Sequence, residues 1–274
     1  MLISTEEVIL NSTQEKLLIS GWGKKICSTQ LKRITYLSDK KNVQGYLSYP
    51  TEAESNYPLI IWNRGGNRDE GKIDDFLAKG IFGEIASWGY VVLSSNYREE
   101  DEFGGSEIND VMNLITLSDE LPYCNSSKIG MEGWSRGGMM TYLALSKSKR
   151  INCAVIISGL SDLMRNENNR SDQSKLYRKL FGIDDQAEFE KRKRERSAVC
   201  FSDKIKKDSN VLLIHGTSDE KVSYLDSVDM YEKLKANGIN CRLELIEGGD
   251  HYLRKSRELT SRLRKEWFDM YLKN

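Results

Sequence analysis

Prolines, histidines and net charge are scarce in this chain of 274 residues, which has three prolines and two histidines. Its Lys+Arg and Asp+Glu counts are both 41, so the formal net charge is zero. A neutral chain has no overall charge with which to attract nucleic acid or an anionic membrane. The sequence also lacks an apolar run of the ~20 residues that span a bilayer. We therefore expect neither nucleic acid nor a membrane as a partner.

Paired cysteines are also lacking. The five cysteines form no C-x-x-C motif and no cluster with the spacing of metal ligands. An odd, dispersed set is typical of reduced thiols in a cytoplasmic protein. The N-terminus, MLISTEEVILNSTQEKLL, has no basic start and no long apolar stretch, so it does not resemble a signal peptide. The sequence therefore predicts a cytoplasmic location and no bound metal.

Buried strands and amphipathic helices alternate along most of the chain. Apolar runs at 59–62, 90–94, 129–131, 153–157, 211–214 and 242–246 predict strands, and helical patterns follow them, the first with glycines at 80 and 83 as candidate breaks. Runs at 32–37 and 43–49 flank a polar turn and predict an antiparallel hairpin at about 32–49. We expect a mostly parallel, eight-stranded sheet with helices on both faces.

One segment interrupts this alternation. Residues 160–209, here called the cap segment, are polar and densely charged, and they include EFEKRKRER at 188–196. Because the charges in this run are of both signs, we expect a solvated helix face rather than a nucleic-acid patch. The cap segment is expected to cover the strand ends as a small insertion in a single domain spanning residues 1–274.

A strand, a sharp turn and a helix are predicted in KIGMEGWSRGGMMTYLAL, residues 128–145. The turn fits G-x-S-x-G, in which the serine, here Ser135, has a strained backbone and an exposed hydroxyl. Side chains at Gly133 or Gly137 would collide with the neighbouring strand or helix. The N–H of Arg136 lies at the start of the helix, where the backbone can stabilise an oxyanion. An ordinary turn with a solvent-facing serine is the alternative.

A serine nucleophile requires a base, and the base requires an orienting acid. His251 lies in a Gly-rich loop after the last strand, whereas His215 ends a strand in HGTSD and is expected to pack locally. Asp219 is the best placed acid, because the order Ser135, Asp219, His251 is that of α/β-hydrolases. Asp250 is less suitable, since residues adjacent in sequence rarely hold the required geometry.

GWSRGG, HGTSDEKV and GGDH resemble the catalytic domain of the prolyl oligopeptidase family of serine hydrolases, which has the α/β-hydrolase fold. WNRGGNRD is similar to the family's Gly-Gly oxyanion loop, and NYRE to its Asn-Tyr-Arg loop. The resemblance extends from about residue 32 to the C-terminus. It implies that Ser135 is the nucleophile, Asp219 the acid and His251 the base, and that no metal or organic cofactor takes part.

The same resemblance implies an oxyanion hole made by the Arg136 N–H and the loop of Gly65 and Gly66. The sequence departs from the family at Arg136, where Tyr is frequent, and at Asn63-Arg64, where His is common. Peptidases of the family usually carry a β-propeller as well, and we expect none here, because few residues precede the region of similarity. These departures leave two activities open, a peptidase and an esterase.

The expected substrate is a short peptide or a small-molecule ester. Candidates for substrate contact are Trp134, Arg64 and Tyr97. A carboxylate within 99–102 would bind the free amine of an aminopeptidase substrate, although a solvated loop is the simpler interpretation. A binding protein without catalytic activity is a further alternative, and a homo-oligomer is left open.

Overall fold

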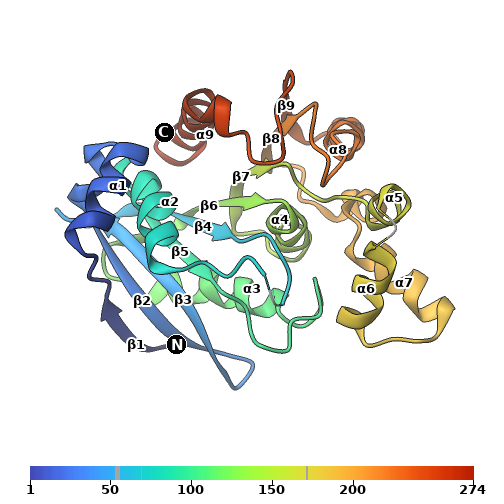
Figure 1. Ribbon diagram of the computed structural model, residues 1–274, viewed down its shortest axis with the longest axis horizontal. Coiled ribbons are helices and arrows are strands. Elements are labelled where there is room, and N and C mark those ends of the chain that lie inside the picture. The colour runs from blue at the N-terminus through green and yellow to red at the C-terminus, as the bar shows by residue number, and fades with distance from the viewer. Residues whose placement is uncertain (53–55, 69, 171) are drawn as a thin grey trace.

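The structure is a computed structural model that describes residues 1–52, 56–68, 70–170 and 172–274. Within these residues, nine strands form one sheet in the order β1-β2-β3-β5-β4-β6-β7-β8-β9 (Figure 1). β1, β2 and β3 pair antiparallel with their neighbours, and the other pairs are parallel. The strands are β1 (Leu2–Glu7), β2 (Thr29–Ser38), β3 (Lys41–Pro50), β4 (Tyr57–Asn63), β5 (Val91–Ser95), β6 (Cys124–Trp134), β7 (Ile151–Ile157), β8 (Asn210–Gly216) and β9 (Asn240–Ile246).

Helices cover both faces of the sheet. They are α1 (Ser12–Trp22), α2 (Asp75–Ser87), α3 (Ile108–Leu117), α4 (Arg136–Lys147), α5 (Leu163–Asn169), α6 (Gln173–Phe181), α7 (Gln186–Arg196), α8 (Leu225–Ala236) and α9 (Arg257–Leu272). Apolar side chains of α3, α4 and α8 pack on one face, and those of α2 and α9 on the other (Figure 1). In the part of the chain that the structure describes, no helix is long and apolar enough to cross a membrane.

The continuous apolar run of β4 follows from this layering. Leu59 and Ile61 belong to the core on one side of the sheet, whereas Ile60 and Trp62 belong to the core on the other side. A strand that is buried on both faces needs apolar residues at successive positions. The predicted mostly parallel sheet with helices on both faces is therefore confirmed.

The prediction of eight strands is wrong by one, because β1 adds a ninth strand at the edge of the sheet. Its residues are exposed apart from the partly buried Leu2, so no apolar pattern marks it as a strand. The helix α1 also lies outside the predicted elements. The sequence nevertheless contains a signal for the start of this helix, since Asn11 and Gln14 form a reciprocal N-terminal cap.

Two glycines let α1 and the segment after it approach α2 closely. A Cβ at Gly80 would lie 2.6 Å from a ring carbon of Trp22, and one at Gly83 would lie 3.2 Å from Oγ1 of Thr29. The helix runs without interruption through both positions, so the predicted breaks are wrong. The glycines serve close packing between elements, which outweighs their low helix propensity.

The cap segment forms α5, α6 and α7. The whole charged run at 188–196 lies on α7, and the expectation of a solvated face is wrong for two of its cations, because Lys193 and Arg196 are buried. Lys193 forms ion pairs with Glu167 and Glu190. Nε of Arg196 donates to the carbonyl oxygen of Phe103 at 3.0 Å. Ion pairs thus connect the cap segment internally, and a hydrogen bond from Arg196 connects it to the body of the protein.

Candidate active site

The parallel strands end at one edge of the sheet and bring four loops together there. β4 and β6 are neighbours, and Asn63 at the end of β4 pairs with Gly133 near the end of β6. The helices α2 and α4, which follow these two strands, pack on opposite faces of the sheet. The gap between such strand ends is the usual ligand site in open α/β sheets. β8 and β9 end as neighbours on the same side of β6.

Ser135 occupies a sharp turn between β6 and α4. Its φ and ψ are 58° and −123°, a conformation that is costly for a residue with a side chain. A Cβ at Gly133 would lie 2.1 Å from the carbonyl oxygen of Gly137, and one at Gly137 would lie 1.9 Å from that of Asn63. The predicted strand–turn–helix and the predicted need for both glycines are therefore confirmed.

We expect Gly137→Ala to lower the free energy of unfolding by about 3 kcal/mol, because the new methyl group meets a backbone oxygen that cannot rotate away. Urea unfolding followed by tryptophan fluorescence measures the change. Gly21→Ala is the matched control, since Gly21 lies in α1 and a Cβ there approaches no atom closer than 3.9 Å. Equal stability of Gly137→Ala and the wild type would contradict the prediction.

Asp219 and His251 come together beside this turn. Nδ1 of His251 lies 2.7 Å from Oδ2 of Asp219, whose carboxylate is buried. The N–H groups of Lys221 and Val222 donate to Oδ1 at 2.8 and 2.9 Å. Although burial opposes ionisation, hydrogen bonds from the histidines and from Val222 hold the pKa of Asp219 well below its ordinary value. The acid is therefore ionised and suited to orient an imidazole.

His215 is a further contact of the same carboxylate. Its Nε2 lies 3.1 Å from Oδ2 of Asp219, and its Nδ1 lies 2.7 Å from Oγ of Ser227. The side chain of His215 is buried, as expected for a histidine that packs locally. The contact with Asp219 was missed, although both residues flank one tight turn after β8. His215 thus contacts the same carboxylate oxygen of Asp219 as His251 does.

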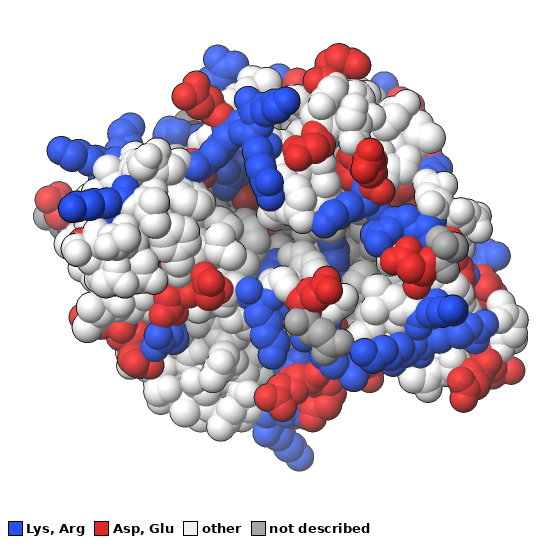
Figure 2. Space-filling view, in the orientation of Figure 1, with Lys and Arg blue, Asp and Glu red and all other residues white. Residues whose placement is uncertain are grey.

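A pocket of about 650 Å³ opens over this edge of the sheet. Ser135, His251, Trp134, Gly65 and Gly66 lie on its wall. No hydrogen bond joins Ser135 to His251 among the described residues, which is common in structures without substrate. The rim carries both signs of charge, with Glu70 and Asp172 on one hand and Lys72, Arg170 and Lys221 on the other. Figure 2 shows the same mixture of signs over this face.

Trp134 connects the serine turn to the histidine loop. Its Nε1 donates to the carbonyl oxygen of His251 at 3.0 Å, and its ring stacks on the imidazole with the centroids 5.7 Å apart. The ring also meets Tyr252 edge-on. Trp134 lies on the pocket wall, as expected for a residue that contacts substrate. It also holds the loop that carries His251.

The glycine loop after β4 lies directly against the serine turn. A Cβ at Gly65 would lie 3.0 Å from the carbonyl oxygen of Trp134 and 3.2 Å from Cβ of Ser135, so a side chain there would crowd the serine turn. Nη1 of Arg64 donates to the carbonyl oxygen of Gly65 at 3.0 Å. Because the peptide group is planar and trans, the N–H of Gly66 points away from that carbonyl oxygen. Gly66 lies on the pocket wall, and the N–H of Arg136 lies in the first turn of α4, where N–H groups have no acceptor within the helix.

Two of the residues predicted to contact substrate, Arg64 and Tyr97, lie outside the pocket lining. Arg64 is 1% exposed, and its guanidinium donates to the carbonyl oxygens of Gly65 and Asn96. Tyr97 is 5% exposed, and its hydroxyl donates to the carbonyl oxygen of Arg64. Neither side chain lines the pocket among the described residues. Both instead hold the glycine loop, a role that depends on contacts between distant segments and leaves no local signal in the sequence.

The acidic loop after β5 also differs from its expected solvated form. Asp101 is 1% exposed, and its carboxylate pairs with Arg136. Glu107, at the end of the loop, is fully buried and pairs with the same guanidinium. The Asp101 carboxylate is therefore already engaged and not open to the amine of a substrate.

The sheet, the serine turn and the position of the Asp219–His251 pair define an α/β-hydrolase. The sequence model of the prolyl oligopeptidase family matches residues 85–274. The chain therefore belongs to the prolyl oligopeptidase family, and the expected serine hydrolase of prolyl oligopeptidase type is confirmed.

Curated relatives agree with this membership. The uncharacterized peptidase YtmA of Bacillus subtilis is 29% identical over 214 residues, which cover 75% of this chain and 80% of that protein. The uncharacterized peptidase YuxL of the same organism is 24% identical over 250 residues, which cover 84% of this chain and 37% of that protein. The chain thus spans most of one relative and little more than a third of the other.

A solved structure supports the fold. The acylaminoacyl peptidase of Pyrococcus horikoshii superposes with a TM-score of 0.78 at 20% sequence identity. The match covers 90% of this chain and 42% of the other chain. At this identity the likeness establishes the α/β-hydrolase fold alone.

Proposed function

We propose that this protein is a serine peptidase in which Ser135 is the nucleophile, His251 the base and Asp219 the orienting acid. The observation that carries the proposal is the 2.7 Å contact between His251 and Asp219, beside a serine with strained backbone on the wall of the same pocket. A serine hydroxyl needs such a base to become nucleophilic at neutral pH. Family membership supports the peptidase activity.

In the proposed reaction, Nε2 of His251 takes the proton of Ser135 Oγ as the oxygen attacks the acyl carbonyl. Nδ1–H of His251 donates to Asp219, which stabilises the imidazolium. The N–H groups of Arg136 and Gly66 hold the oxyanion of the tetrahedral intermediate. His251 then protonates the leaving amine, and a water molecule hydrolyses the acyl-enzyme with His251 again as base. The roles of these residues rest on geometry and on the family resemblance.

The proposed substrate is a short peptide. A volume of about 650 Å³ lies within the roughly 300–1,000 Å³ usual for small-molecule sites. We also propose that the cap segment forms one wall of the site, which is supported by the positions of Leu160, Leu176 and Tyr177 on the pocket lining. A small ester is the second candidate substrate, because the same acyl-enzyme chemistry cleaves esters. A cytoplasmic location and the oligomeric state stay predictions.

The test is intact-mass analysis after labelling with a fluorophosphonate, followed by a panel of substrates. We expect one adduct per chain at Ser135, mapped by peptide mass spectrometry. Peptidyl p-nitroanilides and p-nitrophenyl esters with the same acyl group then separate a peptidase from an esterase. Absence of an adduct on folded protein would overturn the proposed mechanism and favour a binding protein. Cleavage of esters alone would favour the esterase.

A further inference from the structure

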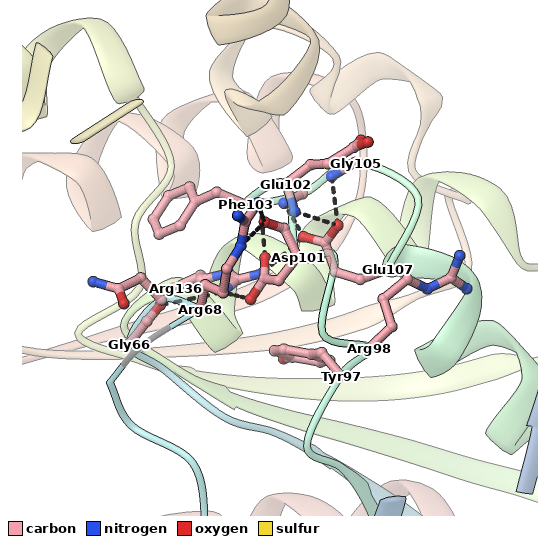
Figure 3. Close-up of polar contacts among 12 residues, drawn as sticks. Gly66, Arg68, Tyr97, Arg98, Asp101, Glu102, Phe103, Gly105, Glu107 and Arg136 are labelled. Carbon is pink, nitrogen blue, oxygen red and sulfur yellow. Dashed lines mark hydrogen bonds and ion pairs between the residues drawn. The ribbon is translucent and has the colours of Figure 1, made fainter. Parts of the chain in front are cut away.

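The side chain of Arg136, the residue after the nucleophile, lies in a buried cluster of charges (Figure 3). Arg136 is 2% exposed. Its Nη1 and Nη2 donate to the two carboxylate oxygens of Asp101 at 2.6 and 2.5 Å. Nη2 also donates to Oε1 of Glu107 at 2.7 Å. One guanidinium thus joins the start of α4 to two acids of the loop between β5 and α3.

This loop is fixed around the two acids by its own backbone. The N–H of Phe103 donates to Asp101, and those of Glu102 and Gly105 donate to Glu107 at 3.2 and 3.1 Å (Figure 3). The carboxylates are therefore saturated with donors and shielded from water. Burying such a pair has a large desolvation cost, which a well-packed apolar pair would avoid. A role in orienting the neighbouring backbone would account for the charges.

The cluster also contacts the glycine loop on the other side of the proposed oxyanion hole. Nη1 of Arg136 lies 3.4 Å from the carbonyl oxygen of Gly66. Nη2 of Arg64, which holds the carbonyl oxygen of Gly65 through its Nη1, lies 3.7 Å from Oδ2 of Asp101. Asp101 therefore lies between an arginine of the glycine loop and the arginine that follows the nucleophile.

Arg68 adds a third cationic contact to the same acidic residue. Its Nε and Nη2 donate to the backbone carbonyl oxygen of Asp101 at 3.1 and 2.7 Å (Figure 3). Arg64 precedes the glycine pair and Arg68 follows it, so the chain on both sides of this pair contacts Asp101. The position of the glycine pair relative to the acidic loop is thus set by Asp101 and its arginines.

We propose that the Arg136–Asp101 pair is a positioning device that fixes the spacing of the two oxyanion donors, the N–H groups of Arg136 and Gly66. The inference rests on the proposed function and goes beyond it, because it assigns a role to two buried side chains that take no part in the proposed proton transfers. Small displacements of preorganised donors reduce stabilisation of the transition state while leaving substrate binding largely intact.

The test uses Arg136→Lys and Asp101→Asn in the full chain. A lysine keeps the charge of Arg136, but its single ammonium cannot form the two-pronged contact with Asp101. We expect kcat for p-nitrophenyl butyrate to fall about 10–100-fold in either variant, with KM changed by less than about twofold. The second-order rate of fluorophosphonate labelling should fall by a similar factor, since the phosphoryl oxygen occupies the oxyanion hole.

Asp110→Asn is the matched control. Arg98 and Asp110 form an ion pair of 2.6 Å that anchors the same loop, and its acid is as deeply buried as Asp101. The control should lose thermal stability to a similar extent but keep kcat within about twofold of the wild type.

Equal losses of kcat in the control and in the test variants would overturn the proposal, because the cluster would then be merely structural. A rise in KM at unchanged kcat would also overturn it. If Arg136→Lys does not fold, Asp101→Asn, which keeps the side-chain shape, decides between these outcomes. A wild type that takes no fluorophosphonate would instead refute the proposed function on which the inference rests.

Discussion

Ser135→Ala is expected to lower kcat by about 10⁶-fold, because the variant has no hydroxyl with which to form the acyl-enzyme. A residual rate above that of water would come from binding and from the oxyanion donors. The alanine accepts the backbone conformation of Ser135 no less readily than the serine does, so the melting temperature should stay close to that of the wild type. Initial rates on the best p-nitrophenyl ester or p-nitroanilide, measured at saturation, give the comparison.

Ser158→Ala provides the control for this change. Ser158 follows β7, is buried, and has a positive φ of 47°, but its hydroxyl has no hydrogen-bond partner among the described residues. Its removal should leave kcat within about twofold of the wild type. Full activity of Ser135→Ala would show that the nucleophile lies elsewhere in the chain.

Asp219→Asn is expected to have the second largest effect, a loss of about 10⁴-fold in kcat. The amide of asparagine can donate to Nδ1 of His251, and the ring proton then moves to Nε2. An imidazole with its proton on Nε2 cannot accept the proton of Ser135. The loss of kcat should be present at every pH between about 6 and 9. No pH in this range should restore the wild-type rate.

The adjacent acid gives the matched control for this change. Asp250 precedes His251 in the sequence and is exposed, so Asp250→Asn should keep kcat within about twofold of the wild type. A larger loss in Asp250→Asn than in Asp219→Asn would show that Asp250, and not Asp219, orients His251. His215→Asn, measured alongside, reports how much the second histidine contributes through the carboxylate that it shares.

The sequence predicts the central strands well because they are buried on both faces and therefore need continuous apolar runs, as in β4. It also places Ser135, Asp219 and His251 after strands, and parallel strands end at a common edge. β1 exposes nearly all of its side chains and α1 exposes most of its own, so no clear hydrophobic period reveals them. Their formation depends on pairing with β2 and on packing of Trp22 against Gly80.

The charged parts of the site were not predictable in the same way. A run such as Glu99–Glu102 has the composition of a solvated loop, and only the approach of Arg136 from a distant strand end makes burial of Asp101 favourable. The burial of Arg64 was also not predictable, because the guanidinium donates to backbone carbonyl oxygens. Every residue has such an oxygen, so the sequence does not show which ones would bind Arg64. A local sequence pattern therefore locates the nucleophile, but it does not show which charged side chains are buried.

The two outer strands of the sheet have a consequence for the behaviour of the protein at high concentration. An exposed strand edge is a template on which another chain can add a strand and start aggregation. β1 covers the edge of β2 and carries Glu6 and Glu7, which are both exposed. At the opposite edge, Arg242 and Glu244 of β9 form an ion pair. These charged side chains oppose the pairing of a strand from another molecule with β1 or β9, so the fold resists edge-to-edge assembly at both ends of the sheet.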